Sequence, residues 1–314
     1  MTSFVLFILL IAGGASYVSW AKHAVAAGAH AWWFVVAAPI AYLAPVVLIA
    51  SISFALSWIW RSPRPASARL DLAGCVRLFV GEVRAVAASW LLIAFHRFVI
   101  RDPAPQPGAH PLLLVHGVLV NDGVWFTVRR RLARAGVAGI YTANYGPPYE
   151  SIDHFARQLR ARIDEVCSKT GAARVTLLCH SMGGLVARTC LRDTGSARIE
   201  RIVTLGTPHH GSVLAWMYFG RCLAQMRPGN TWLSALNRDE GDIAPVPIVS
   251  IWSRHDNLVL PQTSSELGGV ENIALIGIGH NALLGDAGVV ARVQRALGNS
   301  STQDISGDAS TELR

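Results

Sequence analysis

The sequence predicts an α/β fold in its last two-thirds, with a mostly parallel sheet covered by helices on both faces, preceded by apolar membrane helices. Short apolar runs alternate with segments of helical periodicity between residues 112 and 298. Charged residues make up only 15% of the 314-residue chain, against about 25% in typical soluble domains. No charged side chain occurs from residue 2 to 21 or from residue 31 to 60. This composition excludes a disordered chain and a coiled coil.

Alternation of short strands and helices defines the region from residue 112 to 298. The expected strands are 112–117, 139–145, 174–179, 201–206, 246–252 and 272–278. Helices are expected between them, for example over residues 151–169, where apolar residues recur at helical spacing. Residues 299–314 are polar and are expected to form a disordered tail.

Two apolar segments near the N-terminus, at residues 3–21 and 31–60, are long enough to cross a bilayer as helices. We expect both to span. One span with a cleaved or interfacial segment, or a soluble apolar core, are the alternatives. Residues 70–100 carry the pattern of an amphipathic helix that lies on a membrane surface or docks onto the next domain. The proline-rich stretch 101–111 is the expected linker.

The charge distribution predicts how the chain sits in the membrane. The formal net charge is +8, and Arg61, Arg64, Arg69 and Arg77 follow the second apolar segment, whereas the loop before it carries only Lys22. By the positive-inside rule, residues from 61 onward face the cytoplasm; with a single span they face the opposite side. The cations are expected to contact anionic lipids rather than nucleic acid. The oligomeric state stays open.

Ser181 is the candidate nucleophile. It lies between the strand 174–179 and a helix over 182–193, and Gly183 and Gly184 supply the small residues that a sharp turn requires. Such a turn exposes the serine above the N-terminus of the helix, where developing negative charge is favoured. Cys179 stands where the usual G-x-S-x-G pattern has glycine. The alternative is a serine that serves only as a helix N-cap.

His280 and Asp256 are the candidate base and its orienting acid. In this architecture the partners follow the nucleophile in the order acid, then histidine. Asp256 follows the strand 246–252 and His280 follows the strand 272–278, so both loops lie at the carboxyl edge of the sheet. A serine hydroxyl needs an imidazole to remove its proton, and a carboxylate fixes the tautomer of that imidazole.

Other residues compete for these roles. Asp239 and Asp242 are alternative acids, and His255 is a weaker candidate base because it lies on the loop of Asp256. The backbone N–H groups of Val118 and Met182 are the candidate oxyanion donors. The first follows a strand that ends in His-Gly, and the second follows the nucleophile.

Four motifs together resemble the bacterial α/β-hydrolase lipases of the triacylglycerol lipase type. They are 115–117 (VHG), 180–184 (HSMGG), 205–211 (LGTPHHG) and 253–256 (SRHD). The resemblance covers roughly residues 110–295 and leaves residues 1–105 without a counterpart. It implies an α/β-hydrolase fold, hydrolysis of carboxylic esters and no cofactor. By this likeness the catalytic residues map to Ser181, Asp256 and His280, and the oxyanion donors to Val118 and Met182.

The combined prediction is a serine esterase or lipase anchored in the bacterial inner membrane, acting on hydrophobic esters through an acyl-enzyme. Acyl transfer or thioester hydrolysis by the same triad is the first alternative, and a catalytically silent interaction protein is the second. Residues 212–240 are interpreted as a lid or as part of the core, with Trp216 and Phe219 as candidate acyl contacts. No metal site is expected, because the histidine spacing fits no metal signature. Five cysteines without a C-x-x-C pair indicate buried thiols rather than a disulfide framework.

Overall fold

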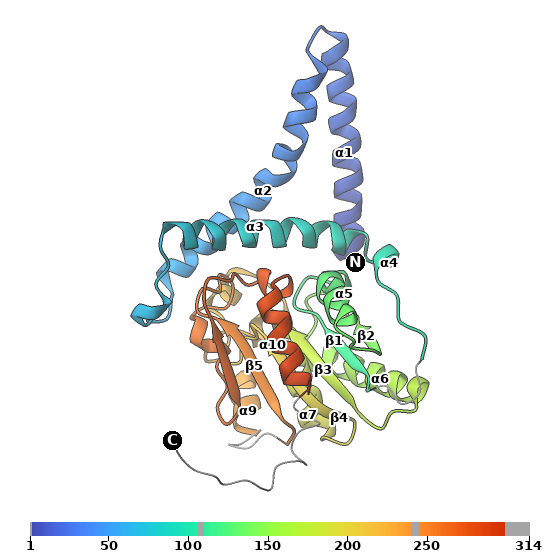
Figure 1. Cartoon of the computed structure of the whole chain (residues 1–314), viewed down its shortest axis with the longest axis vertical. Helices are drawn as coiled ribbons and strands as arrows, with labels where there is room; N and C mark the ends of the chain where they lie inside the picture. The colour runs from blue at the N-terminus through green and yellow to red at the C-terminus, as the bar shows by residue number, and fades with distance from the viewer. Residues whose placement is uncertain (1, 106–109, 240–244, 299–314) are drawn as a thin grey trace, which may run out of the picture.

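Six parallel strands form the centre of the C-terminal part of the molecule in the computed structural model, which describes residues 2–105, 110–239 and 245–298 (Figure 1). The strand order is β2-β1-β3-β4-β5-β6, and every neighbouring pair is parallel. The strands are β1 (Leu112–Val115), β2 (Ile140–Ala143), β3 (Val175–His180), β4 (Ile199–Leu205), β5 (Ile248–Ser253) and β6 (Glu271–Leu275). The predicted tail 299–314 and part of the predicted linker, 106–109, lie outside the described residues.

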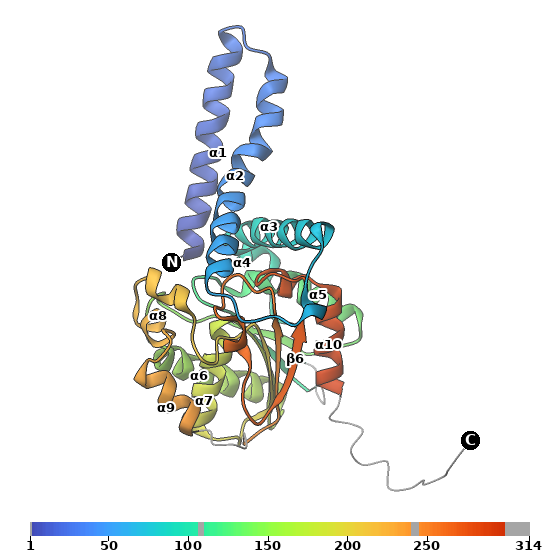
Figure 2. The same ribbon diagram turned by 90° about the vertical axis from the view of Figure 1, so that its left-hand side faces the viewer.

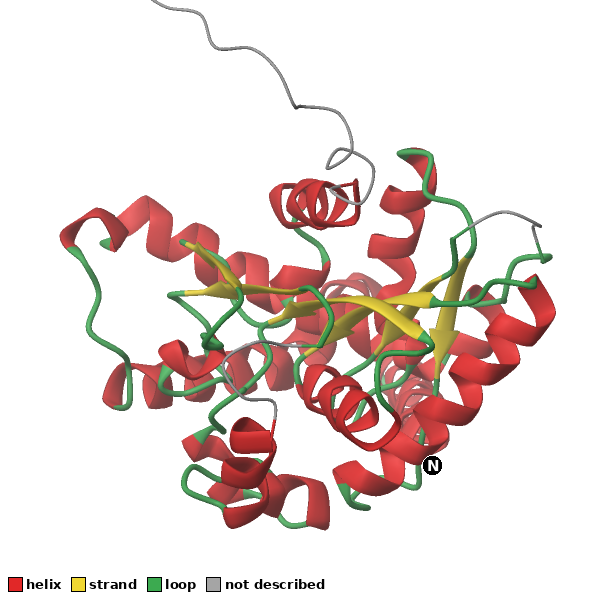
Figure 3. Ribbon diagram, turned by 90° about the horizontal axis from the view of Figure 1, so that it is seen from below, coloured by secondary structure: helices red, strands yellow, loops and turns green. Residues whose placement is uncertain are grey.

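Helices cover both faces of this sheet (Figure 3). Alternate side chains of β1 show the division: Leu113 and Val115 belong to the core cluster with α6 and α7, whereas Leu112 and Leu114 pack in the cluster with α5 and α10. The helices of this part are α5 (Phe126–Arg134), α6 (Ile152–Thr170), α7 (Met182–Thr194), α8 (Arg221–Gln225), α9 (Thr231–Asp239) and α10 (Ala287–Gly298). The strands β1, β2, β3 and β5 are buried throughout, as their continuous apolar runs require, whereas the edge strand β6 is mostly exposed.

The N-terminal helices form a hairpin of two long helices and a third helix that crosses its base. Helix α1 (Thr2–Ala26) and helix α2 (Ala31–Ile59) project away from the sheet and its helices, and the first residue of α1 and the last residue of α2 lie at the end nearest the sheet (Figures 1 and 2). Helix α3 (Leu72–Ala94) runs across the base of the hairpin, followed by the single turn α4 (His96–Val99). Both α1 and α2 contain a stretch long and apolar enough to cross a membrane, and almost none of either stretch is covered by the rest of the chain.

Helix α2 differs between its two halves. The helix continues through Pro39 and Pro45, each of which lacks the backbone N–H of a regular helical hydrogen bond. Its buried residues are Val46, Ala50, Ser53 and Ser57, all in the half nearest the sheet. The first half is exposed and apolar, so only the end of α2 is part of the globular structure.

Helix α3 covers loops at the carboxyl ends of the strands. Its first turn is capped by Asp71, whose carboxylate accepts a hydrogen bond from the Gly74 N–H (2.7 Å). It packs against the short 3-10 helices at Asp122–Trp125 and Ala282–Leu284, which follow β1 and β6. The amphipathic helix expected over 70–100 is thus docked onto the next domain, and it ends at residue 94.

Candidate active site

Ser181 lies at a strained turn between β3 and α7. Its backbone angles are φ 55° and ψ −128°, a left-handed conformation that costs a non-glycine residue roughly 1–3 kcal/mol. The turn is held from both sides: the Ser181 N–H donates to the Leu205 carbonyl (2.9 Å), and the Thr207 hydroxyl donates to the Ser181 carbonyl (2.8 Å). The sheet therefore fixes the serine in a partly exposed position at the end of β3, as a nucleophile requires.

Three glycines make room for this turn. A Cβ atom at Gly183 would lie 2.4 Å from the Val115 carbonyl oxygen, and one at Gly184 would lie 2.2 Å from the Thr207 hydroxyl. At Gly117 a Cβ would approach the Ser181 Cβ to 3.0 Å. The glycines after Ser181 are thus required by packing, as the sequence predicted. Cys179, at the position of the usual first glycine, is fully buried in β3 without disturbing the turn.

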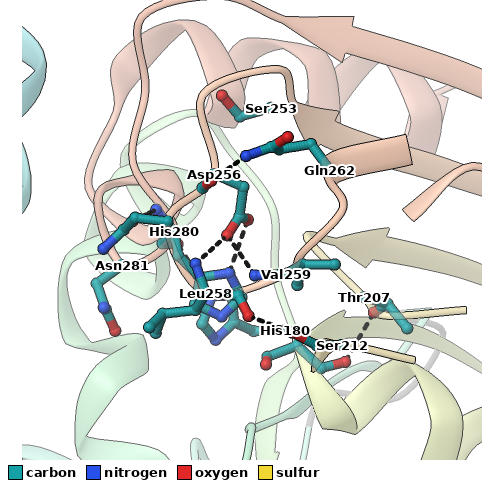
Figure 4. A network of polar contacts seen from close by, with 12 residues as sticks. His180, Thr207, Ser212, Ser253, Asp256, Leu258, Val259, Gln262, His280 and Asn281 are labelled. Atoms are coloured by element: carbon teal, nitrogen blue, oxygen red, sulfur yellow. Dashed lines mark hydrogen bonds and ion pairs between the residues drawn. The ribbon is translucent and has the colours of Figure 1, made fainter. Parts of the chain in front are cut away.

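His280 and Asp256 form a buried pair on two neighbouring loops (Figure 4). The His280 Nδ1–H donates to Asp256 Oδ2 at 2.7 Å, and the two residues are 3% and 1% exposed. The other oxygen of Asp256 accepts hydrogen bonds from the backbone N–H groups of Leu258 (2.7 Å) and Val259 (2.8 Å). Because Nδ1 is bound to the carboxylate, Nε2 is the imidazole nitrogen left for proton transfer.

The charges around His280 favour its protonated form. Burial alone would lower its pKa, but the charge and hydrogen bond of Asp256, together with the charge of Glu82, raise the pKa above its usual value. The neighbouring His180 behaves oppositely: burial and the proximity of His280 hold its pKa well below the usual value. Neutral His180 donates from Nε2 to the His280 carbonyl (3.2 Å), so it supports the loop of His280.

A cavity of about 210 Å³ brings the predicted residues together. It is lined by Ser181, His280 and Val118, and its walls include Ala215 and Tyr218. The lining is mostly apolar with a few polar groups, which is the usual composition of a small-molecule site. Asp256 lies behind His280, away from this lining.

The two candidate oxyanion donors lie next to the same site. Val118 lines the cavity, and Met182 is the first residue of α7, directly after Ser181. Backbone N–H groups in the first turn of a helix have no acceptor within that helix, so the Met182 N–H is available to a ligand. The close approach of Gly117 to Ser181 keeps the Val118 backbone near the nucleophile.

The predicted acyl contacts Trp216 and Phe219 lie on the surface. They are 62% and 75% exposed, and neither lines the cavity, whereas their neighbours Ala215 and Tyr218 do. The guanidinium carbon of Arg227 lies 4.6 Å from the ring centroid of Trp216. The ring of Phe219 stacks on that of Tyr149, with ring centroids 5.0 Å apart. The sequence position of this segment, directly after the motif 205–211, places it beside the site. It does not show which of its side chains face the cavity.

The competing residues have other surroundings. The His255 Nδ1 accepts a hydrogen bond from the Gly277 N–H (3.1 Å), and burial with the charge of Arg64 lowers its pKa to about 4. The side chain of Asp239 and all of Asp242 lie outside the described residues. No group of three His, Cys, Asp or Glu side chains placed to hold a metal occurs in the described part of the chain.

Sequence reasoning missed the residues that hold the loop of His280. The Asn257 side chain accepts from the His280 N–H (2.9 Å), and its amide donates to the Ser53 hydroxyl in α2 (2.7 Å). Glu82 in α3 is 0% exposed and accepts hydrogen bonds from Asn281 and Ala282. A single glutamate among apolar residues 70–100 was the available signal, because a carboxylate is buried only where partners satisfy it.

The parallel six-stranded sheet, the turn at Ser181 and the loops after β5 and β6 define an α/β-hydrolase fold. The mature form of a Bacillus licheniformis lipase has the same fold, with a TM-score of 0.53 and 18% identity over 63% of this chain and 96% of that one. Lipase B of Aspergillus fumigatus also has a TM-score of 0.53, with 21% identity over 61% of this chain and 54% of the lipase.

Sequence comparisons connect the chain to particular lipases. Residues 141–281 match the family model described as the PGAP1-like alpha/beta domain. A triacylglycerol lipase of Pseudarthrobacter phenanthrenivorans is 33% identical over 115 residues, covering 34% of this chain and 35% of the relative. One of Burkholderia plantarii is 33% identical over 115 residues, covering 34% and 31%. The chain thus aligns with about a third of the length of these curated relatives.

Proposed function

We propose that the protein is a membrane-anchored serine hydrolase that cleaves hydrophobic carboxylic esters. Ser181 attacks the ester carbonyl carbon while its hydroxyl proton passes to His280 Nε2. The new C–O bond places negative charge on the carbonyl oxygen, which the N–H groups of Val118 and Met182 stabilise. When the tetrahedral intermediate collapses, the ester C–O bond breaks and the leaving alcohol takes the proton from His280.

The second half of the reaction uses the same residues. A water molecule gives a proton to His280 Nε2 and its oxygen bonds to the acyl carbon. The bond to Ser181 then breaks, and the proton returns to the serine oxygen as the carboxylic acid leaves. Asp256 stays ionised throughout and stabilises the imidazolium that forms twice per turnover.

One observation supports this proposal above the others. The strained Ser181 and His280 line one cavity, and Asp256 binds His280 from behind it, although the three residues lie on loops far apart in sequence. The positive φ of Ser181 costs a non-glycine residue roughly 1–3 kcal/mol, and such strained backbone clusters at active sites. Similarity to triacylglycerol lipases over about a third of their length supports the same chemistry.

Hydrophobic substrates are proposed because of the surfaces next to the site. The helices α1 and α2 are apolar and nearly uncovered. The side chains Trp216, Met217, Tyr218 and Phe219 form a run of exposed apolar residues before α8. Helix α8 lies at the same end of the hydrolase domain as the hairpin (Figure 2). Exposed apolar surface of this kind is typical of membrane contact.

Hydrolysis of p-nitrophenyl esters with medium or long acyl chains tests the activity. We expect the purified full chain to release p-nitrophenol and Ser181→Ala to lose roughly 10⁴-fold or more of kcat. Ser234→Ala, an exposed serine in α9, is the matched control and should keep full activity. Undiminished hydrolysis by Ser181→Ala would refute the mechanism. Acyl transfer to an added alcohol in place of water would identify a transferase.

Cys75 offers a test of the proposed cytoplasmic orientation. It is exposed on α3, whereas the other four cysteines are buried. A membrane-impermeant maleimide should therefore label the chain in inverted bacterial inner-membrane vesicles but not in intact spheroplasts. Cys75→Ser controls for labelling at other sites. Labelling of intact spheroplasts would place the domain on the outer side.

A further inference from the structure

A second cavity, of about 540 Å³, lies between the membrane hairpin and the loops of the active site. Its walls include Val5, Leu6 and Leu9 of α1, Ile49 of α2, and Val86 and Trp90 of α3. The lining residues of α1 and α2 lie in the halves of these helices nearest the sheet, where the two helices separate above α3 (Figure 1). We refer to it as the hairpin cavity.

The hairpin cavity adjoins the cavity that contains Ser181. Four residues line both: Leu119, Val120, Leu258 and Asn281. They come from the loops after β1, β5 and β6, so the common wall lies at the carboxyl edge of the sheet. The two cavities are therefore neighbours, one beginning between the apolar helices and the other containing Ser181.

The chemistry of the hairpin cavity suits a hydrocarbon chain. Among the described residues that line it, Glu82 is the only charged one, and its carboxylate already accepts hydrogen bonds from Asn281 and Ala282. Asn281 lines both cavities, and Asn257 accepts a hydrogen bond from the His280 N–H (2.9 Å), so polar groups are present where the hairpin cavity meets the active site. A mostly apolar lining with polar groups at that junction matches an acyl chain that ends in an ester.

We infer that the hairpin cavity takes one acyl chain of a bilayer lipid and that the ester reaches Ser181 directly from the membrane. This inference rests on the proposed hydrolase function and names its substrate class: long-chain acyl esters embedded in a bilayer. A substrate that enters this way does not pass through water. Its hydrolysis depends on the walls of the hairpin cavity, whereas a short soluble ester can reach the first cavity without it.

Narrowing the hairpin cavity tests this inference. The full chain is reconstituted into phospholipid vesicles and assayed with 4-methylumbelliferyl oleate in the bilayer and 4-methylumbelliferyl butyrate in water. We expect Ile49→Trp to lower oleate hydrolysis by about tenfold or more and to change butyrate hydrolysis by less than about twofold. Val86→Trp narrows the cavity from α3 and should give the same separation of the two substrates.

Leu48→Trp is the matched control, since Leu48 is exposed on α2 and does not line the cavity. It should leave both activities unchanged. Oleate hydrolysis unaffected by Ile49→Trp and Val86→Trp would overturn the inference, as would an equal loss on both substrates. Failure of the proposed function itself looks different: the unmodified chain would then hydrolyse neither ester in a Ser181-dependent way.

A second inference concerns Glu82 and stands on hydrogen bonds rather than on a cavity. Its carboxylate accepts from the Asn281 N–H (3.1 Å to each oxygen), the Asn281 side-chain amide (2.7 Å) and the Ala282 N–H (3.0 Å). A Cβ atom on Gly279 would lie 2.4 Å from Glu82 Oε2. The residues on both sides of His280 are thus packed or bound against one side chain of α3.

The geometry points to Glu82 as a positioning residue for His280. It is supplied by the N-terminal helices, yet it fixes the loop that carries the base and adds negative charge near the imidazole. Groups that act on the His280 charge are Asp256 and Glu82, which favour the imidazolium, and His180, which lies 4.7 Å away between ring centroids. Removing the charge of Glu82 therefore favours neutral His280.

Glu82→Gln separates positioning from simple folding. We expect kcat to fall by roughly tenfold to a hundredfold with little change in KM, because a small displacement of the base slows proton transfer. The acid limb of the pH–rate profile should also move to lower pH, a shift that a purely structural role does not produce. Glu82→Asp keeps the charge and should keep the acid limb in place.

Arg77→Gln, which removes an exposed charge from the same helix, is the control and should change neither quantity. A Glu82→Gln variant with an unchanged kcat would overturn this inference. A lowered kcat with an unshifted acid limb would overturn the charge effect on His280 and leave only a packing role.

Discussion

The two sides of the candidate active site are held by different parts of the chain. On the nucleophile side, Ser181 is bound by Leu205 and Thr207, both within the hydrolase domain. On the base side, the supports of the His280 loop are bound by Ser53 of α2 and Glu82 of α3.

The loop that carries Asp256 is also held by a residue of the N-terminal part of the chain. The Gln262 amide donates to the Asp256 carbonyl (2.9 Å), and the Gln262 oxygen accepts from the Ser62 N–H (2.9 Å), just after α2. The N-terminal helices and the residues just after them therefore contact the loops of Asp256 and His280, whereas the turn of Ser181 is held within the sheet domain.

On the base side of this comparison, the largest effect is expected from Asp256→Asn. The amide cannot hold His280 in the tautomer that leaves Nε2 free, so kcat should fall roughly 10³- to 10⁴-fold while the fold is kept. Steady-state kinetics and circular dichroism of the variant check this. A loss below about tenfold would mean that the base side does not depend on this carboxylate.

The pH dependence sharpens the base side of the comparison. His280 must be neutral to accept the serine proton, and its pKa is raised, so kcat/KM should rise with pH through a midpoint above 6.5, about tenfold per unit below it. The raised pKa also has a consequence for stability. The His280–Asp256 pair contributes most below the ordinary pKa of histidine, and the contribution is lost as pH rises through the raised value.

A midpoint below the ordinary pKa of histidine would contradict the charge environment described for His280. Asp256→Asn should move the midpoint downward, because the first of the two charges that favour the imidazolium is then gone.

The nucleophile side is tested by Gly117→Ala. The added Cβ would lie 3.0 Å from the Ser181 Cβ, so the serine must shift by a few tenths of an ångström or the loop must move. We expect kcat to fall about tenfold without a shift of the acid limb, since His280 is untouched. A shifted acid limb would show that the two sides are coupled more tightly than their separate supports suggest.

The smallest expected effect comes from Ser53→Ala. It removes one hydrogen bond to Asn257, worth about 0.5–1.5 kcal/mol, and should lower kcat about twofold to tenfold. Ser57→Ala on the same helix is the control, because the Ser57 hydroxyl donates to the Phe54 carbonyl of its own helix (2.8 Å). Equal effects of the two substitutions would assign the loss to α2 packing.

The order of strands and helices follows from the sequence because apolar runs and turn residues are local signals. The same holds for the turn at Ser181, whose two following glycines are required by contacts with β1 and Thr207. The pairing of His280 with Asp256 was predictable because parallel strands bring their carboxyl ends to one edge. The sequence therefore predicts the parts of the site that are set by the course of the backbone, namely the turn at Ser181 and the loops after β5 and β6.

The contribution of the N-terminal helices was not predictable in the same way. The contact of Glu82 with Asn281 joins residues 199 positions apart, and the Ser53–Asn257 contact spans 204. Hydropathy identifies α2 and α3 as apolar elements but gives no information about which single polar residue meets a distant loop. The exposed positions of Trp216 and Phe219 likewise depend on the conformation of the 3-10 helix Val213–Met217 and of the residues after it, which the sequence pattern does not determine.

The central claim, that Ser181 is a nucleophile activated by His280, is tested most directly by a fluorophosphonate probe. The full chain in membranes is reacted over a range of pH, digested and analysed by mass spectrometry. The probe should form its adduct on the peptide that contains Ser181, with a rate that rises above pH 6.5 and that nearly vanishes in His280→Ala. A folded chain that takes no label at Ser181, or labels equally fast without His280, would contradict the claim.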